Sequence, residues 1–219
     1  EGTLWSKPDW IDHNRDLDAS AGEGTMKGKA REMQRPGTFW EYNDVRVNRL
    51  ALALLRVWKR PLPEVLKERI MAPIGASADW EWHGYENSWV EIDGKRIQSV
   101  SGGSHWGGGM FISSRDQALT GLMMARGGTW NGKRVLSDAY IDAATTPCPI
   151  NSDYGYLWWL NGAGGSAPSA PRSSYFAKGK GSNVIWIDPE LDLVAVVRWI
   201  ERDAFDGFCG KVMEALQRP

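Results

Sequence analysis

The first segment of this sequence that could bind a ligand is a glycine-rich run, Ser101 to Gly109. Five of the eight residues from Gly102 to Gly109 are glycine, so the run predicts a loop whose backbone can come close to another group. His105 and Trp106 stand inside the run, where they either line a ligand cleft or form a structural turn. A phosphate site is not favoured, because the run lacks the strand–glycine–helix context and a partner lysine.

Several catalytic and metal-binding signatures are missing from the sequence. There is no Gly-x-Ser-x-Gly, no His-Glu-x-x-His and no Gly-x-x-x-x-Gly-Lys-Ser/Thr, which argues against a nucleophile elbow, a zinc protease and a P-loop NTPase. His13, His83 and His105 show no ligand spacing, and Cys148 and Cys209 form no Cys-x-x-Cys pair. We therefore expect neither a metal nor a cofactor.

Length and composition narrow the class of protein further. The chain has 219 residues, of which 42% are hydrophobic and 24% charged, and its formal net charge is −1. These values are ordinary for a globular protein that buries a substantial core. The charge balance gives no support to a nucleic-acid partner, and no apolar run approaches the roughly 18 residues of a membrane-spanning helix.

The elements that must position the chemical groups begin with a helix. After Tyr42, either Asn43 or Asp44 can cap a helix. Apolar side chains then recur with helical spacing, at Val47, Leu50, Ala51, Leu54, Leu55 and Trp58. Pro61 ends this helix, and a second short helix is expected from Pro63 to Met71.

Turn and capping signals organise the middle of the chain. Asp93-Gly94 predicts a hairpin turn between residues 80 and 100. Ser113 or Ser114 caps a further helix that Gly127-Gly128 closes, and Ser137 caps another that stops at Pro147.

The C-terminal third has the composition of strands. Aromatic and β-branched residues predict strands over 154–160, 174–178, 184–188 and 193–200, followed by a helix over about 204–216. Short links between successive strands imply an antiparallel sheet with helices packed on it, an α+β fold. We expect residues 1–150 to form a mostly helical and loop region and residues 151–219 the sheet and last helix, as one intertwined unit.

Three segments occur in an order that resembles a known family. They are Tyr42-Asn43-Asp44, the glycine loop, and the stretch from Ala177 to Asn183 that reads Ala-Lys-Gly-Lys-Gly-Ser-Asn. The order is similar to that of the serine hydrolases related to class C β-lactamases and penicillin-binding proteins, including their esterase branch. The resemblance covers about residues 5–216 and implies a β-lactamase/transpeptidase-like fold with an antiparallel sheet flanked by helices.

That family uses Ser-x-x-Lys, then Tyr-x-Asn, then Lys-x-Gly or His-x-Gly. Tyr42 to Asp44 matches the second element, with Asp44 where Asn is commoner, and Ala177 replaces the Lys or His of the third. The resemblance implies that Tyr42 exchanges protons with the serine–lysine pair, since a hydroxyl is a poor nucleophile until a base takes its proton. Asp44 either takes part or only caps the helix.

The third element is expected to hold the substrate carbonyl. The resemblance implies that the backbone N–H of Lys180 stabilises the oxyanion, and that Lys178, Gly179 and Gly181 bind substrate together with His105 and Trp106. The alternative is a solvated turn. Lys178 and Lys180 can supply the charge that Ala177 lacks, although strand alternation points both away from the side that Ala177 faces.

The first element is absent from these residues. No serine is followed three residues later by lysine, and the resemblance places that serine upstream of Glu1, along with the first strands of the sheet. We therefore expect the fragment alone to be inactive and its own N-terminal segment to be a partner. The resemblance slightly favours a periplasmic or secreted location.

Two interpretations of the function follow. The first is a serine hydrolase that forms an acyl-enzyme with an ester, amide or β-lactam, a small molecule or short peptide. The second is a non-catalytic ligand-binding module on the same scaffold, in which Ala177 marks lost chemistry.

Overall fold

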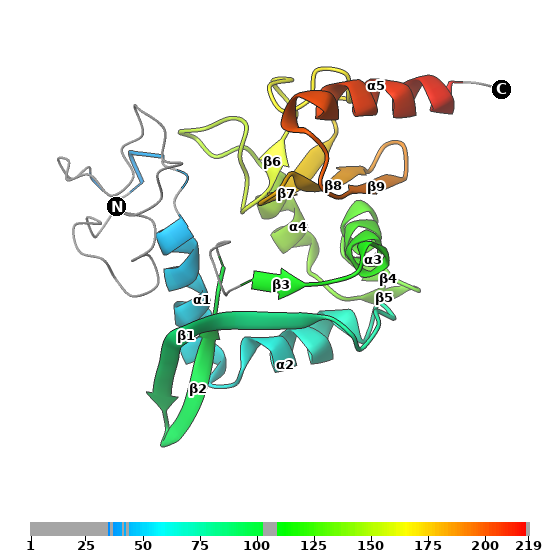
Figure 1. Ribbon diagram of the computed structural model, residues 1–219. Coiled ribbons are helices and arrows are strands. Elements are labelled where there is room, and N and C mark those ends of the chain that lie inside the picture. Colours follow the sequence, from blue (N-terminus) through cyan, green and yellow to red (C-terminus); the bar gives the residue numbers. More distant parts are fainter. Residues whose placement is uncertain (1–34, 36, 41, 43, 103–108, 218–219) are drawn as a thin grey trace. The chain divides into compact units, whose positions relative to one another are not determined.

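The computed structural model describes residues 35, 37–40, 42, 44–102 and 109–217 (Figure 1). His105 and Trp106 lie outside this part. The chain forms two compact units, which we describe separately. Unit 1 comprises residues up to 68 together with 80–111, and unit 2 comprises 69–79 together with 112–219.

Unit 1 combines two helices with a three-stranded antiparallel sheet of order β2-β1-β3. Its elements are α1 (Asp44–Trp58), α2 (Leu62–Leu66), β1 (Glu81–Ile92), β2 (Lys95–Val100) and β3 (Gly109–Phe111). The predicted helices are confirmed, except that the second passes at its end into a π-helical turn, η2 (Lys67–Met71). β3 was not foreseen in the sequence.

The β1–β2 hairpin closes on the turn that the sequence predicted. Asp93 and Gly94 have φ of 50° and 75°, and two successive residues with positive φ are the signature of the turn that matches strand twist. Glycine carries no penalty there and aspartate tolerates the conformation. The apolar face of α1 packs on this hairpin through Ala51, Leu55, Leu62, Ile92, Ile97 and Val100.

Unit 2 is built on a four-stranded antiparallel sheet of order β6-β7-β8-β9. Its elements are α3 (Ser114–Ala125), β4 (Thr129–Trp130), β5 (Lys133–Arg134), α4 (Asp138–Thr145), β6 (Trp159–Leu160), β7 (Tyr175–Gly179), β8 (Asn183–Asp188), β9 (Leu193–Val197), the 3-10 turn η3 (Arg202–Ala204) and α5 (Phe205–Leu216). Figure 1 shows α5 and α3 on opposite sides of this sheet.

Alternating side chains bury both faces of the sheet. On one face Phe176, Val184 and Trp186 pack against Phe205 and Cys209 of α5. This apolar core fixes β7 and β8 from the side of α5.

The other face packs closely on α3 because one helical position lacks a side chain. A Cβ at Gly121 would lie 2.7 Å from Cγ1 of Val194 and 3.0 Å from Cγ2 of Ile185. Only glycine lets the helix approach the sheet this far. Because α3 rests on β8 and β9, residues 112–150 group with the sheet.

A buried carboxylate ties the segment 69–79 to the start of α3. Asp116 is 1% exposed and accepts hydrogen bonds from the backbone N–H of Ser77 (3.0 Å) and from its hydroxyl (2.6 Å). The hydroxyl of Ser113 caps the helix by accepting from the N–H of Asp116. Burial alone would raise the pKa of Asp116, but the hydrogen bonds of Ser77 and Ser113 and the charge of Arg115 outweigh it and hold that pKa below its usual range.

Two predicted strands are shorter than expected. The strand predicted over 154–160 is regular only in β6, because residues 155–158 form a turn in which the N–H of Gly155 donates to the carbonyl of Trp158 and Leu157 has a φ of 64°. The strand predicted over 193–200 ends at Val197, and Trp199 has a φ of 58°. The remaining predicted strands and the last helix are confirmed within a residue or two. The fold class, α+β, is as predicted.

Candidate active site

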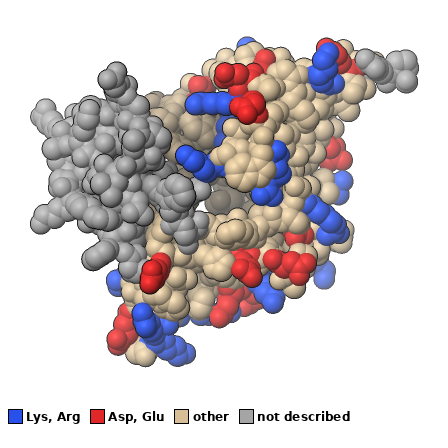
Figure 2. Space-filling model, in the orientation of Figure 1, with Lys and Arg blue, Asp and Glu red and all other residues tan. Residues whose placement is uncertain are grey.

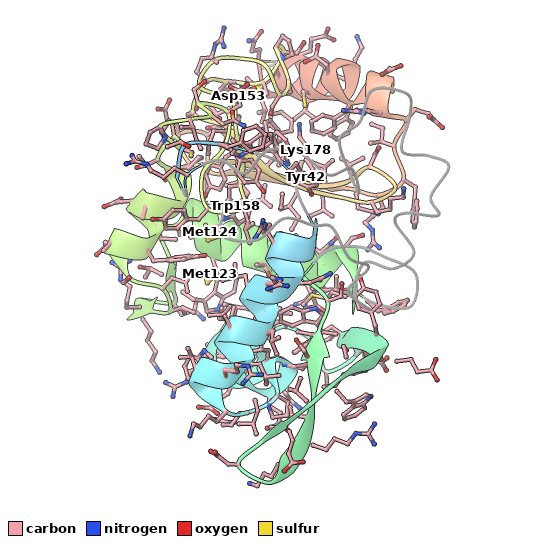
Figure 3. The ribbon with its side chains drawn as sticks, turned by 90° about the vertical axis from the view of Figure 1, so that its left-hand side faces the viewer. Tyr42, Met123, Met124, Asp153, Trp158 and Lys178 are labelled. Atoms are coloured by element: carbon pink, nitrogen blue, oxygen red, sulfur yellow. The ribbon has the colours of Figure 1, made fainter. Side chains whose placement is uncertain are left out.

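Tyr42 lies directly before α1. It stands two residues before Asp44, the first residue of the helix, and Figure 3 places it at the N-terminal end of α1. Its side chain is 40% exposed. The N-terminus of a helix carries partial positive charge, which favours an anionic group beside it. A tyrosine at this place can therefore hold and return a proton.

A buried amide fixes the helix that follows Tyr42 to the start of the glycine run. Asn48 is 1% exposed, and its Oδ1 accepts from the backbone N–H of Gly102 at 2.9 Å and from the hydroxyl of Ser101 at 3.5 Å. Gly102 touches the helix directly, since a Cβ there would lie 2.6 Å from the carbonyl oxygen of Val47. The first turns of α1 are thus held against the first residues of the glycine run.

In unit 2 the third predicted segment forms the hairpin between β7 and β8. Gly179 pairs with Asn183 across the hairpin, and three residues, Lys180, Gly181 and Ser182, make the turn. Gly181 and Ser182 have φ of 76° and 52°. The side-chain amide of Asn183 donates to the carbonyl oxygen of Lys180 at 2.6 Å, which orients the peptide groups of the turn.

Strand β7 extends beyond β6, the strand that pairs with its outer edge. β6 pairs only with Tyr175 and Phe176, so the stretch from Ala177 to Gly179 continues beyond the two residues of β6. Backbone N–H and C=O groups on such an edge can bind the backbone or carbonyl of another molecule. Donors held rigidly at this edge are suited to stabilise negative charge on a carbonyl oxygen.

The ammonium group of Lys178 lies on the α5 face of the sheet. It is 5.0 Å from the ring centroid of Phe176, 5.7 Å from that of Trp159 and 5.8 Å from that of Phe205, and it donates to the carbonyl of Ser166 at 3.4 Å. Burial is the main reason that the pKa of Lys178 is lowered. Figure 3 shows Lys178 beneath α5.

Ala177 occupies the opposite face. It pairs with Ile185, whose side chain contacts α3. The alternation expected from the sequence therefore separates the Ala177 methyl from the Lys178 ammonium. A charge near the outer edge of β7 would have to come from Lys180, in the turn, rather than from Lys178.

A second buried carboxylate holds the other end of the hairpin. Asp188 is fully buried and accepts from the hydroxyls of Ser173 (2.8 Å) and Ser174 (2.7 Å) and from the N–H of Leu191 (3.0 Å). The indole N–H of Trp186 donates to the hydroxyl of Ser174. Both ends of the β7–β8 pair are thus fixed by polar contacts, which keeps its backbone donors in place.

Other kinds of site find no support in the described part of the chain. No group of three or more His, Cys, Asp or Glu side chains there could hold a metal ion. None of the helices among these residues has the length and apolarity needed to cross a membrane. On the face shown in Figure 2, basic and acidic side chains are mixed and neither sign forms a continuous stripe over the described surface.

The predicted residues fall into two groups. Lys178, Gly179, Lys180 and Gly181 lie in one hairpin of unit 2, and Tyr42 and Asp44 lie at the start of α1 in unit 1; the side chain of Asp44 is outside the described part. The roles assigned to all of them stay predictions.

Sequence reasoning missed Asn48 and Trp199. Asn48 carried a detectable signal, because it stands three residues before Ala51 and seven before Leu55, on the buried face of the helix. Trp199 carried none, since only the folded chain brings Gly181 to it. Gly102 belongs to the glycine run, for which a close backbone approach was predicted, but its partner Val47 was not.

Comparisons with known proteins agree with the fold. The family model described as Beta-lactamase matches residues 8–199. A solved structure assigned as a 6-aminohexanoate-dimer hydrolase from Bacillus anthracis is 21% identical, with a TM-score of 0.61 over 84% of this chain and 46% of that one. Another, assigned as a β-lactamase from Bacteroides dorei DSM 17855, is 14% identical, with a TM-score of 0.58 over 87% of this chain and 62% of that one.

The present chain thus spans less than two thirds of either solved structure. At these identities the likeness shows the fold. No curated protein matches the chain.

Proposed function

The chain belongs to the Beta-lactamase family, and from that premise we propose that it is the larger part of a serine hydrolase that forms an acyl-enzyme with an ester, amide or β-lactam. The observation that carries the proposal is the position of Tyr42 two residues before the start of α1, in a chain whose third family segment forms a hairpin in which no described strand covers the outer side of β7 beyond Phe176. No serine of this sequence begins a Ser-x-x-Lys, so the nucleophile is supplied from outside these 219 residues.

In the proposed first step, the phenolate of Tyr42 takes the proton of the serine hydroxyl as the serine oxygen attacks the substrate carbonyl carbon. The new C–O bond places a negative charge on the carbonyl oxygen, and the N–H of Lys180 donates to it. Tyr42 then returns its proton to the leaving alcohol or amine as the old bond breaks.

In the second step water replaces the leaving group. Tyr42 accepts a proton from the water as the water oxygen attacks the acyl carbon, and the proton returns to the serine oxygen when the ester bond of the acyl-enzyme breaks. Asn48 and Gly102 hold the helix that follows Tyr42 in place throughout. Gly179, which has no side chain, leaves room for substrate at the edge of β7.

The test compares Tyr42→Phe with the unaltered natural protein on three substrates: a p-nitrophenyl ester, nitrocefin and a D-alanyl peptide. We expect the variant to lose about 10²- to 10⁴-fold in kcat/KM on the preferred substrate, because that is the typical contribution of general acid–base catalysis. Tyr140→Phe is the matched control, since Tyr140 is an exposed tyrosine of α4, and it should leave the rate unchanged.

Labelling by a fluorophosphonate probe reports the acyl-enzyme directly. The natural protein should be labelled stoichiometrically, and the 219-residue chain alone should not. Rapid labelling of the chain alone would contradict the placement of the nucleophile. A natural protein that neither turns over any of the three substrates nor takes up the probe would instead favour a ligand-binding module, the reading that Ala177 suggests.

A further inference from the structure

An exposed tryptophan lies against the turn that the proposed function makes an oxyanion site. Trp199 is 72% exposed, an unusual state for so large an apolar side chain. The six-membered ring of its indole lies against Gly181, because a Cβ at Gly181 would overlap ring atoms Cζ3 and Cε3. Gly181 follows Lys180 directly, so the indole stands one residue from the proposed oxyanion donor.

The position of this indole is fixed by its neighbours. Arg198 donates to Oδ1 of Asn183 at 2.8 Å and to the carbonyl of Ile112 at 2.9 Å. These two bonds hold the chain where it leaves β9. Trp199 itself has a φ of 58°, a conformation that costs a non-glycine residue free energy and persists only where its surroundings enforce it.

Gly181 therefore covers part of the ring. The contact involves atoms of the six-membered ring, and most of the side chain remains accessible. If the N–H of Lys180 binds the substrate carbonyl, the group next to that carbonyl would contact the planar apolar surface of the Trp199 indole. Flat groups gain most from such a surface, because stacking depends on contact over the whole ring.

We propose that Trp199 is a specificity-determining residue whose indole stacks on a planar apolar group next to the scissile carbonyl. The proposal rests on the proposed function for the carbonyl itself, but the stacking requires no chemistry. Substrates with a flat aromatic group on the acyl side would then be preferred over substrates of equal size that are not flat.

The positive charges near the turn favour an uncharged or electron-rich group as the ligand. The residues of the turn and the end of β9 carry Lys180 and Arg198, and the next carboxylate along the chain is that of Glu201. Arg198 donates hydrogen bonds to an amide oxygen and to a carbonyl oxygen. Both acceptors are neutral, so these bonds do not neutralise its positive charge. A cationic group at this position would be repelled, whereas an aromatic ring would not.

The closing experiment measures equilibrium binding to the natural protein labelled with 5-fluorotryptophan. Three amides serve as probes: phenylacetamide, cyclohexylacetamide, which has a similar size but no flat ring, and acetamide. The ¹⁹F resonance of Trp199 is identified by its loss in Trp199→Phe. We expect phenylacetamide to shift this resonance and to bind roughly three- to tenfold more tightly than cyclohexylacetamide, while acetamide leaves it unshifted.

Two variants separate the role of the indole from a general effect on folding. Trp199→Ala should weaken phenylacetamide binding by roughly three- to tenfold, while Trp199→Phe, which keeps a flat ring, should stay within about threefold of the unaltered chain. Trp89→Ala is the matched control, because Trp89 is also exposed but belongs to unit 1; it should not change the affinity.

The outcomes distinguish this proposal from the proposed function. Equal affinities for the two ring amides, or an unshifted Trp199 resonance, would overturn the stacking role even if the natural protein hydrolyses esters. Selective binding that depends on Trp199, in a natural protein that the fluorophosphonate probe never labels, would keep the stacking role and overturn the hydrolase.

Discussion

The two groups of predicted site residues, one in each unit, are held in place by different physical means. In unit 1, the helix that follows Tyr42 is fixed to the glycine run by one buried amide, Asn48, and by the close approach of Gly102 to Val47. In unit 2, the hairpin that carries Lys180 is packed on both faces by helices and fixed at its end by Asp188. In unit 1 a buried amide adds to the apolar packing of one face of α1, whereas in unit 2 apolar packing on both faces of the sheet positions the hairpin.

This difference predicts how each half responds to damage. Removing a buried polar side chain breaks all of its hydrogen bonds at once. Each former partner is then buried without a hydrogen-bond partner, and this lowers the free energy of unfolding. In an apolar core, the loss of stability increases gradually with the side-chain volume that a substitution removes or adds. The variants below test this contrast in order of expected effect, each by urea unfolding of the 219-residue chain.

The largest effect is expected from Asp116→Ala. The change leaves the N–H and hydroxyl of Ser77 without their acceptor and frees the segment 69–79 from α3, so we expect a loss of about 3–4 kcal/mol in the free energy of unfolding. Asp138→Asn, at an exposed carboxylate paired with Arg134, is the control and should change it by less than about 0.5 kcal/mol.

Asp116 also predicts a pH dependence. Because its pKa is lower in the folded chain than the ordinary value of 3.8, its contribution to stability is complete above that value and is lost as the pH falls through the folded pKa. Unfolding measured from pH 6 down to pH 2.5 should show this loss in the unaltered chain and not in Asp116→Ala. Parallel curves for the two would refute the assignment.

The next effect is expected from Asn48→Ala. Removing the amide leaves the N–H of Gly102 without its acceptor, at a cost of about 1–3 kcal/mol. The amide proton of Gly102 should then exchange faster with solvent, a local change that NMR can follow. Leu50→Ala, at an exposed position of the same helix, should leave that exchange rate as it is; equal rates in both variants would contradict the anchoring role of Asn48.

A smaller effect is expected from Gly121→Ala in unit 2. The added methyl meets Val194 and Ile185 and pushes α3 from the sheet, which should cost about 1–2 kcal/mol after the gain in helix propensity. At Gly207 of α5 a Cβ would have nothing within 4 Å, so Gly207→Ala should instead stabilise the chain by up to about 1 kcal/mol. The same sign for both variants would argue against close packing of α3.

The smallest effect, and a favourable one, is expected from Lys178→Met. The ammonium is surrounded by aromatic rings and its pKa is lowered by burial, so stability should rise with pH between the folded pKa and the ordinary value of 10.5. Methionine keeps the packing without the charge and should add up to about 1 kcal/mol near neutral pH. Lys211→Met, at an exposed position of α5, is the control and should change stability by less than about 0.5 kcal/mol; a loss on Lys178→Met would show that the cation contributes net attraction.

Much of the secondary structure could be predicted from the sequence, because its causes are local. The apolar spacing after Asp44 is that of a helix, Asp93-Gly94 selects a hairpin turn, and Ser113 caps α3 as expected. The strand predicted at 154–160 failed for a tertiary reason. A Cβ at Gly155 would overlap the carbonyl oxygen of Ala144, so the chain turns there to fit against the end of α4.

What the sequence determined by itself about the candidate site is which residues stand next to one another along the chain. It places Tyr42 before a helix and Lys180 between two strands, because capping and strand alternation act over a few residues. The tertiary structure decided what surrounds them. It ended the pairing of β6 with β7 at Phe176, brought Gly102 to Asn48, and laid Trp199 against Gly181. These contacts join residues far apart in the chain, and packing of whole elements sets them, not local preference.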